Sequence, residues 1–463
     1  MSDNAQPIGG SFRDPAGRVF FREGAILRAV YPSGAADYEF VRDAGLHQRL
    51  AATGRLLPAT EVDRTRLALA APEACYVLQH PRLPFISHPY EWSFGALRSA
   101  ALLQLEIHLE GLDCGVTLSD ASAYNCQFRS AEPVFIDHLS FRRYRPGEYW
   151  NGYRQFCEQF LNPLLLQALL GLPFQPWYRG SLEGITAGQL AKLLRLRHKL
   201  NWRVFLHVVL QARAQVAAEI KRMPPRVTGR SLHPEAFRGL IRQLRSWVLH
   251  LHPLQPPRSV WGHYSQEHTY SDAEAGAKAS FVRTAVGAAS PAMLWDLGCN
   301  TGAYSQLALG SGAQLVIGFE SDPLALETAF DLAKQKGLAF VPLYADLANP
   351  SPNQGWAQGE RAGLVERAPA DFILALAFVH HLAIARNIPL PDLIPWLVRL
   401  APRGVVEFVD KSDPTVQKML ALREDIFRDY TIDHFEAQLG RHARITRTTR
   451  VSDSGRTLYA YER

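Results

Sequence analysis

Lysine is scarce in this sequence. It supplies 8 of the 50 basic residues, and the first of them is Lys192. The first 191 residues therefore hold no ammonium side chain, which excludes any N-terminal site that requires a lysine. Long apolar runs are scarce too, because the best stretch, at 164–170, is much shorter than the ~20 residues that cross a bilayer. We therefore expect no membrane-spanning segment and no membrane partner.

Cysteine is sparse and not grouped. The five cysteines are spread singly, without a C-x-x-C pair, so neither a zinc ribbon nor a disulfide framework is indicated. The N-terminus also lacks the basic start and apolar core of a secretory signal. We expect reduced thiols and a cytoplasmic location.

Basic residues exceed acidic ones, but they are scattered. The formal net charge is +6, and no run of five or six basic residues is present. Scattered charge of this kind is typical of a solvated surface. We therefore expect no nucleic-acid partner.

The length of 463 residues predicts two or three domains rather than one. Proline-rich breaks at 223–225 and 252–257 are linker signals, and we place a domain boundary near residue 255. We expect an α+β region over 1–145 that is β-rich and then helical, a helical extension with linker over 146–255, and an α/β domain over 256–463.

The N-terminal half shows two kinds of pattern. Short, largely apolar segments on either side of a Glu-Gly turn predict strands over 18–22 and 25–30, joined as a hairpin. Helical spacing predicts one helix near 36–51 and another over 92–112, and a strand-turn-strand follows over 125–136.

From Met293 onward, apolar strands alternate with helices. This alternation predicts a parallel sheet flanked by helices. The expected strands cover 293–297, 314–320, 339–343, 370–377 and 404–410.

A glycine turn follows the first of these strands. Asp296 precedes a Gly-x-Asn-x-Gly turn over 298–302, where the lack of side chains lets a ligand approach the backbone. Glu320 ends the next strand, 24 residues after Asp296, close to the ~20 expected of an acid that binds a ribose. Asp346 follows the third strand. In a parallel sheet these acids lie at one edge, where α/β sheets bind their ligands.

These residues resemble class I S-adenosylmethionine-dependent methyltransferases, from about Ser259 to the end of the chain. The resemblance implies a Rossmann-like domain with a seven-stranded, mostly parallel sheet. It implies that the turn lines the methionine part of S-adenosylmethionine, that Glu320 binds the ribose, and that Asp346 with Leu347 holds the adenine. The implied cofactor residues are Asp296, Gly298, Asn300, Gly302, Glu320, Ser321, Asp346, Leu347 and Ala377. The alternative is the nucleotide-binding turn of a dehydrogenase, although G-x-G-x-x-G is incomplete here.

Residues outside the turn have implied roles as well. In related methyltransferases the segment before the first strand covers the cofactor, so Tyr264, Tyr270 and Lys278 are expected to close over its aminocarboxylate. Ordinary aromatic packing is the alternative. Glu407 in the fifth strand and Lys411 directly after it are expected to face the substrate. The tail around 423–430 resembles methyltransferase-like proteins connected with nodulation.

A histidine pair follows the fourth strand, where no [D/N]-P-P-[Y/F] motif is present. This disfavours methylation of nucleic-acid bases, and the pair resembles the family branch that acts on small molecules. His380 and His381 are the candidate catalytic residues, because a histidine can take a proton from a hydroxyl near neutral pH. The alternatives are that the histidines pack locally, or that in-line placement needs no base. No metal is expected in this domain.

A second motif lies in the N-terminal part. The spacing of Asp120, Asn125 and Asp137 resembles the catalytic and metal-binding loops of protein-kinase-like phosphotransferases. The phosphate-pairing lysine of that fold is missing, so Arg28 is the stand-in, with Glu39 as its expected partner. We expect a degenerate kinase-like site, with Mg²⁺ and ATP as candidate ligands. The alternative is that Asp120 and Asn125 only cap a turn.

Three functional hypotheses follow. The first is methyl transfer from S-adenosylmethionine to an oxygen or nitrogen of a small molecule, with the kinase-like part recruiting or positioning the substrate. The second is a bifunctional enzyme that also transfers phosphate from ATP. The third is an adaptor that binds ligands without turnover. The sequence leaves the methyl acceptor and the oligomeric state open.

Overall fold

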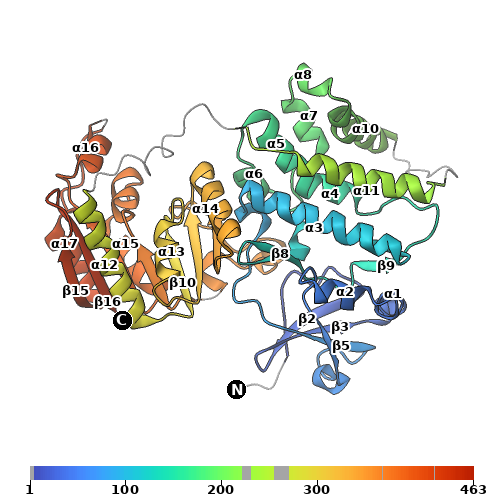
Figure 1. The fold of residues 1–463 in the computed structure, drawn as a ribbon, viewed down its shortest axis with the longest axis horizontal. Helices are drawn as coiled ribbons and strands as arrows, with labels where there is room; N and C mark the ends of the chain where they lie inside the picture. The colour runs from blue at the N-terminus through green and yellow to red at the C-terminus, as the bar shows by residue number, and fades with distance from the viewer. Residues whose placement is uncertain (1–4, 222–230, 255–270, 368, 422) are drawn as a thin grey trace. The chain divides into compact units, whose positions relative to one another are not determined.

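The structure is a computed structural model, and it describes residues 5–221, 231–254, 271–367, 369–421 and 423–463 (Figure 1). Internal contacts divide the chain into two compact units. Unit 1 is Met1–Pro256 with Pro352–Ala362, and unit 2 is Pro257–Ser351 with Gly363–Arg463. The segment Pro352–Ala362 thus folds with unit 1, although it follows the third strand of unit 2 in sequence. The expected division into three domains with separate roles stays a prediction.

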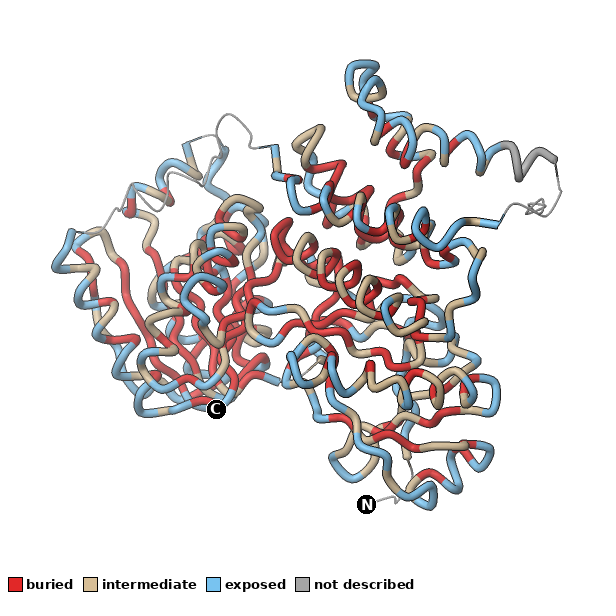
Figure 2. Tube along the Cα trace, turned by 45° about the vertical axis from the view of Figure 1, so that its right-hand side comes forward, coloured by how far each residue is buried: buried red, intermediate tan, exposed pale blue. Residues whose placement is uncertain are grey.

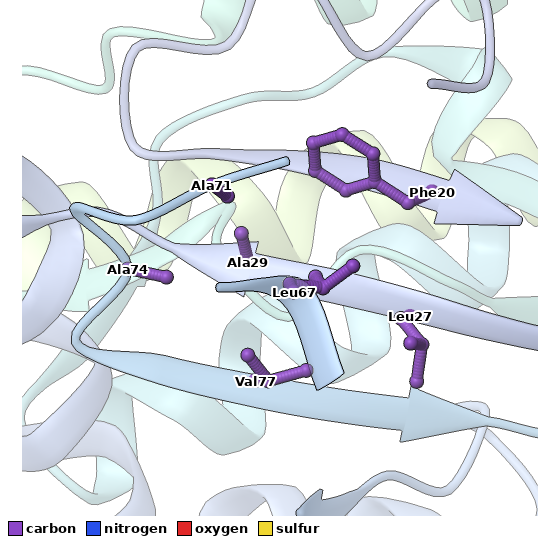
Figure 3. Close-up of a cluster of buried hydrophobic side chains, with 7 residues drawn as sticks. All are labelled: Phe20, Leu27, Ala29, Leu67, Ala71, Ala74 and Val77. Atoms are coloured by element: carbon purple, nitrogen blue, oxygen red, sulfur yellow. The ribbon is translucent and has the colours of Figure 1, made fainter. Parts of the chain in front are cut away.

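Unit 1 begins with an antiparallel sheet that contains the expected hairpin. In spatial order its strands are β1 (Gln6–Pro7), β2 (Gly17–Arg22), β3 (Ala25–Val30), β5 (Tyr76–His80) and β4 (Thr60–Val62). Figure 3 shows the apolar cluster on one face, where side chains of β2, β3 and β5 pack against the 3-10 helix η1 (Arg64–Leu67) and the turn after it. The cluster consists of Phe20, Leu27, Ala29, Leu67, Ala71, Ala74 and Val77.

The single helix expected near 36–51 was wrong. The structure has two helices there, α1 (Pro32–Asp43) and α2 (Leu46–Ala52). Gly45 separates them, because its φ of +69° lies in the left-handed region, where a continuous helix cannot pass. The helix expected over 92–112 is confirmed as α3 (Phe94–Asp113), and the Ser93 hydroxyl caps its first turn.

Two antiparallel strand pairs and a series of helices complete unit 1. β6 (Val116–Leu118) pairs with β9 (Phe141–Arg143), and β7 (Cys126–Arg129) pairs with β8 (Glu132–Phe135), which confirms the strand-turn-strand. The other helices are η2 (Pro89–Glu91), η3 (Ala123–Asn125), α4 (Tyr153–Phe156), η4 (Cys157–Leu161), α5 (Asn162–Leu170), α6 (Gln175–Gly180), α7 (Ala187–Leu193), α8 (Leu196–Lys199), α9 (Trp202–Val204), η5 (Phe205–Leu210), α10 (Gln211–Lys221), α11 (Pro234–Leu249) and η6 (Trp356–Gln358).

Unit 2 is built on a seven-stranded, mostly parallel sheet, as the resemblance implied. In spatial order its strands are β12 (Phe340–Tyr344), β11 (Leu315–Glu320), β10 (Met293–Leu297), β13 (Phe372–Ala375), β14 (Arg403–Val409), β16 (Arg456–Glu462) and β15 (Arg444–Arg450). Among these strands, β16 runs opposite to its neighbours β14 and β15, and the first five are mutually parallel. The five strands expected from the alternation are all present.

Helices flank this sheet, and its strands other than the edge strand β15 form the buried centre of the unit (Figure 2). The helices are α12 (Asp272–Ala289), α13 (Ala303–Leu309), α14 (Pro323–Lys336), η7 (Leu364–Glu366), the π-helix η8 (His381–Ala385), α15 (Leu390–Leu400), α16 (Pro414–Leu420) and α17 (Ile432–His442). Across the ranges given above, none of the helices has both the length and the apolar character that a membrane crossing requires.

Candidate functional site

The three acids expected at strand ends lie at one edge of the unit 2 sheet. β10, β11 and β12 are parallel neighbours, and their register sets Glu320 opposite Tyr344. Asp296 lies near the end of β10, Glu320 ends β11, and Asp346 follows β12. Because the carboxyl ends of parallel strands share an edge, the structure brings these acids to the same side of the sheet.

The turn after β10 passes through left-handed backbone conformations, and its Gly298 is exposed. Gly298, Asn300 and Gly302 have φ values of +79°, +49° and +88°, a region that favours glycine and admits asparagine. A Cβ atom on Gly302 would lie 2.7 Å from the Phe340 ring, so close packing excludes a side chain there. The Asn300 side-chain oxygen accepts a hydrogen bond from the Thr301 N–H at 2.7 Å, which stabilises the turn internally.

Backbone amides fix the Glu320 carboxylate beside this turn. Its Oε2 atom accepts from the Asn300 N–H at 2.9 Å, and its Oε1 atom accepts from the N–H groups of Ser321 and Asp322 at 2.7 and 2.8 Å. Burial raises the pKa of Glu320, and the three amide donors oppose that rise. Each carboxylate oxygen offers two lone pairs, so Oε2 keeps one acceptor position for a further donor such as a hydroxyl.

Asp296 is a buried acid beneath the turn. It is 2% exposed, and its Oδ2 atom accepts from the Ser305 hydroxyl at 2.6 Å. Burial raises the pKa of Asp296 to about 6, with the Glu320 charge adding to the rise and the hydrogen bond from Ser305 opposing it. A cationic group placed next to this carboxyl would lower its pKa again.

Asp346 is better solvated. Its Oδ1 atom accepts from the Ala348 N–H at 3.0 Å, and its Oδ2 atom pairs with the Arg386 guanidinium at 3.0 Å. Leu347 beside it is buried. Asp346 and Leu347 thus bring a carboxylate and an apolar side chain to the sheet edge in consecutive positions. A planar base with an exocyclic amine suits such a pair, because the amine can donate to the carboxylate while the ring packs against the apolar side chain.

A buried charge cluster lies behind the turn after β13. Lys278 Nζ donates to Glu407 Oε2 at 2.7 Å, and the same oxygen accepts from the Ala377 N–H at 2.7 Å. Glu407 Oε1 lies 3.8 Å from the Arg456 guanidinium. Burial lowers the pKa of Lys278, and the Glu407 charge opposes that fall. Glu407 therefore holds Ala377, whose φ is +49°, in its left-handed conformation.

The histidine pair occupies two different environments. The rings of His380 and His381 lie 4.2 Å apart between centroids. His380 is 0% exposed, and neither of its ring nitrogens has a hydrogen-bond partner among the described residues. Burial lowers the pKa of both rings, that of His381 to about 4, so both are neutral near pH 7. His381 is only partly buried, so it alone of the two has contact with solvent.

One expected site residue forms an ion pair, and two others are not described by the structure. Lys411 forms an ion pair with Asp425 at 2.9 Å. Tyr264 and Tyr270 lie outside the residues that the structure describes. The substrate role of Lys411 and Glu407 and the cofactor role of the two tyrosines stay predictions.

Sequence reasoning missed several partners of the predicted residues. Ser305 bonds Asp296, Arg386 pairs with Asp346, and Arg456 approaches Glu407 while it binds Asp413 at 2.7 Å. Arg456 is separated from Asp413 by 43 residues, and no spacing rule links two such residues. The position of Ser305 could have been recognised from the sequence, because it lies in the first turn of the helix that follows the glycine turn.

The four residues expected to form a kinase-like site lie in unit 1 as two pairs, Arg28 with Asp137 and Asp120 with Asn125, and the Ser140 hydroxyl links Asn125 to Asp137. Arg28 on β3 forms a short ion pair with Asp137 and approaches Asp14 at 3.8 Å. The Asn125 side-chain N–H₂ donates to Asp120 at 3.1 Å. The expected Arg28–Glu39 partnership was wrong, because Arg28 turns toward these aspartates and Glu39 instead accepts from the Tyr76 hydroxyl at 2.7 Å.

This cluster does not provide an evident metal site. The Asp137 oxygens accept from Arg28 and from the Ser140 hydroxyl, so a metal ion would compete with these protein donors. Burial raises the pKa of Asp14 and of Asp120, and the Asp137 charge adds to both shifts. Within the described ranges no three His, Cys, Asp or Glu side chains are arranged to hold a metal ion. The expected Mg²⁺ and ATP therefore gain no support.

The chain is similar to a curated protein over nearly its whole length. No family model matches the chain. A curated relative, "Nodulation protein NoeA" from Rhizobium meliloti (strain 1021), is 44% identical over 458 residues, which cover 98% of this chain and 96% of the relative. The chain belongs to the NoeA family. The resemblance of the tail to proteins connected with nodulation is therefore confirmed, and the similarity extends over nearly the whole chain.

Solved methyltransferase structures are similar to part of this NoeA-family chain. The N-methyltransferase NodS from Bradyrhizobium japonicum WM9 is 10% identical, with a TM-score of 0.30, and the match covers 42% of this chain and 97% of NodS. The magnesium protoporphyrin IX methyltransferase (ChlM) from Synechocystis PCC 6803, solved with bound SAH, is 20% identical, with a TM-score of 0.29, and the match covers 40% of this chain and 84% of ChlM.

Proposed function

We propose that this chain is an S-adenosylmethionine-dependent methyltransferase that methylates an oxygen or nitrogen of a small molecule. The observation that supports this most directly is the Glu320 carboxylate, which three amide donors fix beside the open turn with one acceptor position left on Oε2. When bound, S-adenosylmethionine supplies a methyl group that its sulfonium makes electrophilic.

The residues at the sheet edge would divide the binding among them. Glu320 would accept a hydrogen bond from a ribose hydroxyl, and Asp346 with Leu347 would hold the adenine. The turn over 298–302 would admit the methionine part, because its glycines place no side chain there. Asp296 would supply negative charge to the cofactor's ammonium group, and that cation would in turn lower the raised pKa of Asp296.

The acceptor would approach His381 rather than His380. A group that takes a proton from an acceptor must contact it, and His380 has no exposed surface. His381 is partly exposed, and its lowered pKa keeps the ring in the neutral form that a base requires, while it makes the ring a weaker base than an ordinary histidine. His380 would then act as a positioning residue, since its ring lies against that of His381.

Calorimetric titration of the full chain with S-adenosylmethionine tests the cofactor site. We expect binding by the wild type and a loss of about ten- to a hundredfold in affinity for Glu320→Ala, the usual effect of removing a charged hydrogen-bond acceptor. Asp331→Ala is the matched control, because Asp331 is an exposed acid on the neighbouring α14. A wild type that does not bind, or a Glu320→Ala variant that binds equally well, would exclude the proposal.

Turnover separates an enzyme from an adaptor. Release of S-adenosylhomocysteine after addition of an extract of small molecules indicates methyl transfer, whereas cofactor binding without release supports the adaptor. His381→Ala is expected to slow this release by about 10²–10⁴-fold if His381 is the base. An unchanged rate would favour in-line placement without a base.

For unit 1 we propose a role in positioning the substrate rather than in transferring phosphate. The supporting observation is the Arg28–Asp137 ion pair, which occupies the carboxylate that would otherwise bind a metal ion. Arginine is a planar fork rather than a compact point charge, so its exchange for the lysine of active phosphotransferases changes the chemistry of the site.

A further inference from the structure

A long stretch of unit 1 has cationic residues without acidic ones. Between residues 184 and 218 the sequence contains no Asp or Glu but six Lys and Arg residues. The middle of this stretch forms α8, α9 and η5, which follow one another at one end of the unit (Figure 1). This part of the surface is thus formed by one continuous segment of chain, which we call the 192–210 segment.

Large apolar side chains of the 192–210 segment face solvent. Leu196, Leu200 and Trp202 are 74%, 78% and 57% exposed. The helix α8 buries none of its residues, although helices normally turn such side chains toward a core. Four further apolar residues of the segment are exposed, namely Leu193, Phe205, Leu206 and Leu210. Apolar side chains gathered in this way mark an interaction surface rather than chance exposure.

Cationic side chains are interspersed with these apolar ones. Lys192, Arg195 and Arg197 are exposed, and Lys199 and Arg203 are partly exposed. Within the described chain these five residues form no ion pair with any carboxylate, and the Arg203 guanidinium instead lies 5.6 Å from the centroid of the Trp202 ring. The segment therefore presents positive charge that the unit itself does not neutralise.

We propose that the 192–210 segment docks unit 1 onto an anionic lipid surface. Leucine, phenylalanine and tryptophan side chains enter the boundary between headgroups and acyl chains, while Lys and Arg side chains bind the lipid phosphates. The expectation of no membrane partner came from the lack of a spanning segment, and surface docking needs none. The site uses residues far in sequence from the cofactor edge, so it stands independently of the proposed methyl transfer.

Charge favours lipid over a second copy of this chain. In a twofold-symmetric dimer the segment would face itself, which would set the same five cations against one another. An anionic membrane offers the opposite charge over a wide area together with an apolar layer beneath it. A lipid surface therefore matches both properties of the segment at once.

Flotation of the full chain with vesicles tests this inference. We expect the chain to bind vesicles of phosphatidylcholine mixed with phosphatidylglycerol, to bind pure phosphatidylcholine at least about tenfold less, and to be released by high salt. The triple variant Leu196→Ser/Leu200→Ser/Trp202→Ser and the charge reversal Arg195→Glu/Arg197→Glu should each lower binding to the mixed vesicles at least about tenfold.

Matched controls separate lipid docking from general changes in charge or folding. Leu69→Ser removes a leucine that is 93% exposed elsewhere in unit 1, and Arg129→Glu reverses an exposed cation outside the segment. Both should bind like the wild type, and circular dichroism should show all variants folded. No binding to mixed vesicles, equal loss in the controls, or a dimer in ultracentrifugation that the triple variant dissociates would each overturn the inference.

Discussion

Lys278 Nζ lies 2.7 Å from Glu407 Oε2, and the two side chains are 4% and 0% exposed. They join the helix α12 to the strand β14, and the same Glu407 oxygen holds the Ala377 N–H at the end of β13. The pair therefore fixes the turn that leads to His380 and His381. It links the stability of unit 2 to the geometry of its candidate catalytic residues.

Removing one partner of this pair should destabilise unit 2 strongly. We expect Lys278→Met to lower the free energy of unfolding by about 3–5 kcal/mol, because it removes the cation that donates to the buried Glu407 Oε2, while Arg456 stays 3.8 Å from the other oxygen. The double variant Lys278→Met/Glu407→Gln should recover part of the loss, since it leaves no unpaired charge. Urea unfolding followed by circular dichroism measures both.

The exposed ion pair Arg444–Glu462 is the control, with side chains 74% and 49% exposed. Arg444→Ala should change the free energy of unfolding by less than about 1 kcal/mol. If Lys278→Met changed it as little, the buried pair would not hold the turn.

The raised pKa of Asp296 predicts a specific pH dependence. The folded protein keeps this proton up to about pH 6, whereas the unfolded chain loses it near the ordinary value of 3.8. The folded state binds more protons in between, so the free energy of unfolding falls as pH rises through this window, by about 3 kcal/mol. In Asp296→Asn this part of the slope should vanish, because the amide does not titrate.

Urea unfolding at several pH values from about 4 to about 7 tests this dependence. The amide oxygen that Asp296→Asn introduces can still accept a hydrogen bond from Ser305, so the packing is preserved. Asp331→Asn changes an exposed acid and should keep the wild-type slope. Identical slopes for the wild type and Asp296→Asn would contradict the raised pKa.

The sequence predicted most of unit 2 because its signals are local. Apolar strands that alternate with helices gave the five parallel strands, and the glycine turn with Glu320 gave the binding edge. The two antiparallel-paired strands β15 and β16 carried no comparable periodic signal, since β15 is mostly exposed and rich in Arg and Thr. Their existence was implied only by the resemblance.

Contacts between residues far apart in sequence could not be predicted. Arg28 was expected to meet Glu39, which is 11 residues away, but its partner is Asp137, which is 109 residues away. Likewise, the ion pair between Lys278 and Glu407, which are 129 residues apart, was not predicted, while their expected ligand roles stay predictions. A charged residue's partner depends on the three-dimensional packing of its element, which residue spacing does not encode.

Two glycines of unit 2 should respond to alanine in opposite directions. A Cβ atom on Gly318 of β11 would lie 2.8 Å from Cys299 Sγ, so Gly318→Ala should destabilise the unit by about 1–3 kcal/mol and disturb the turn before Asn300. Gly276 of α12 has open space around its Cβ position, so Gly276→Ala should stabilise it by about 0.5–1 kcal/mol. Thermal unfolding compares the pair, and equal shifts would show that the turn is not closely packed.

The Arg28–Asp137 ion pair predicts the behaviour of unit 1. Both side chains are 11% exposed, so Arg28→Met should lower the free energy of unfolding by about 3–5 kcal/mol. Arg42→Met is the control, because Arg42 and its partner Glu61 are 37% and 40% exposed, and it should cost less than about 1 kcal/mol. Adding Asp137→Asn to Arg28→Met should restore part of the loss. Urea unfolding that shows no difference between Arg28→Met and Arg42→Met would contradict this account.

The same pair predicts how unit 1 responds to nucleotide. Since Arg28 and Ser140 donate to the two Asp137 oxygens and would compete with a metal ion, we expect no Mg²⁺-dependent binding of ATP to the wild type in calorimetry. The alternative, in which the unit still transfers phosphate, requires Asp137 to release Arg28 and bind the metal ion. Binding of Mg²⁺ with ATP that disappears in Asp137→Ala but persists in Glu39→Ala would establish that alternative. The same binding would show that the ion pair opens to admit a metal ion.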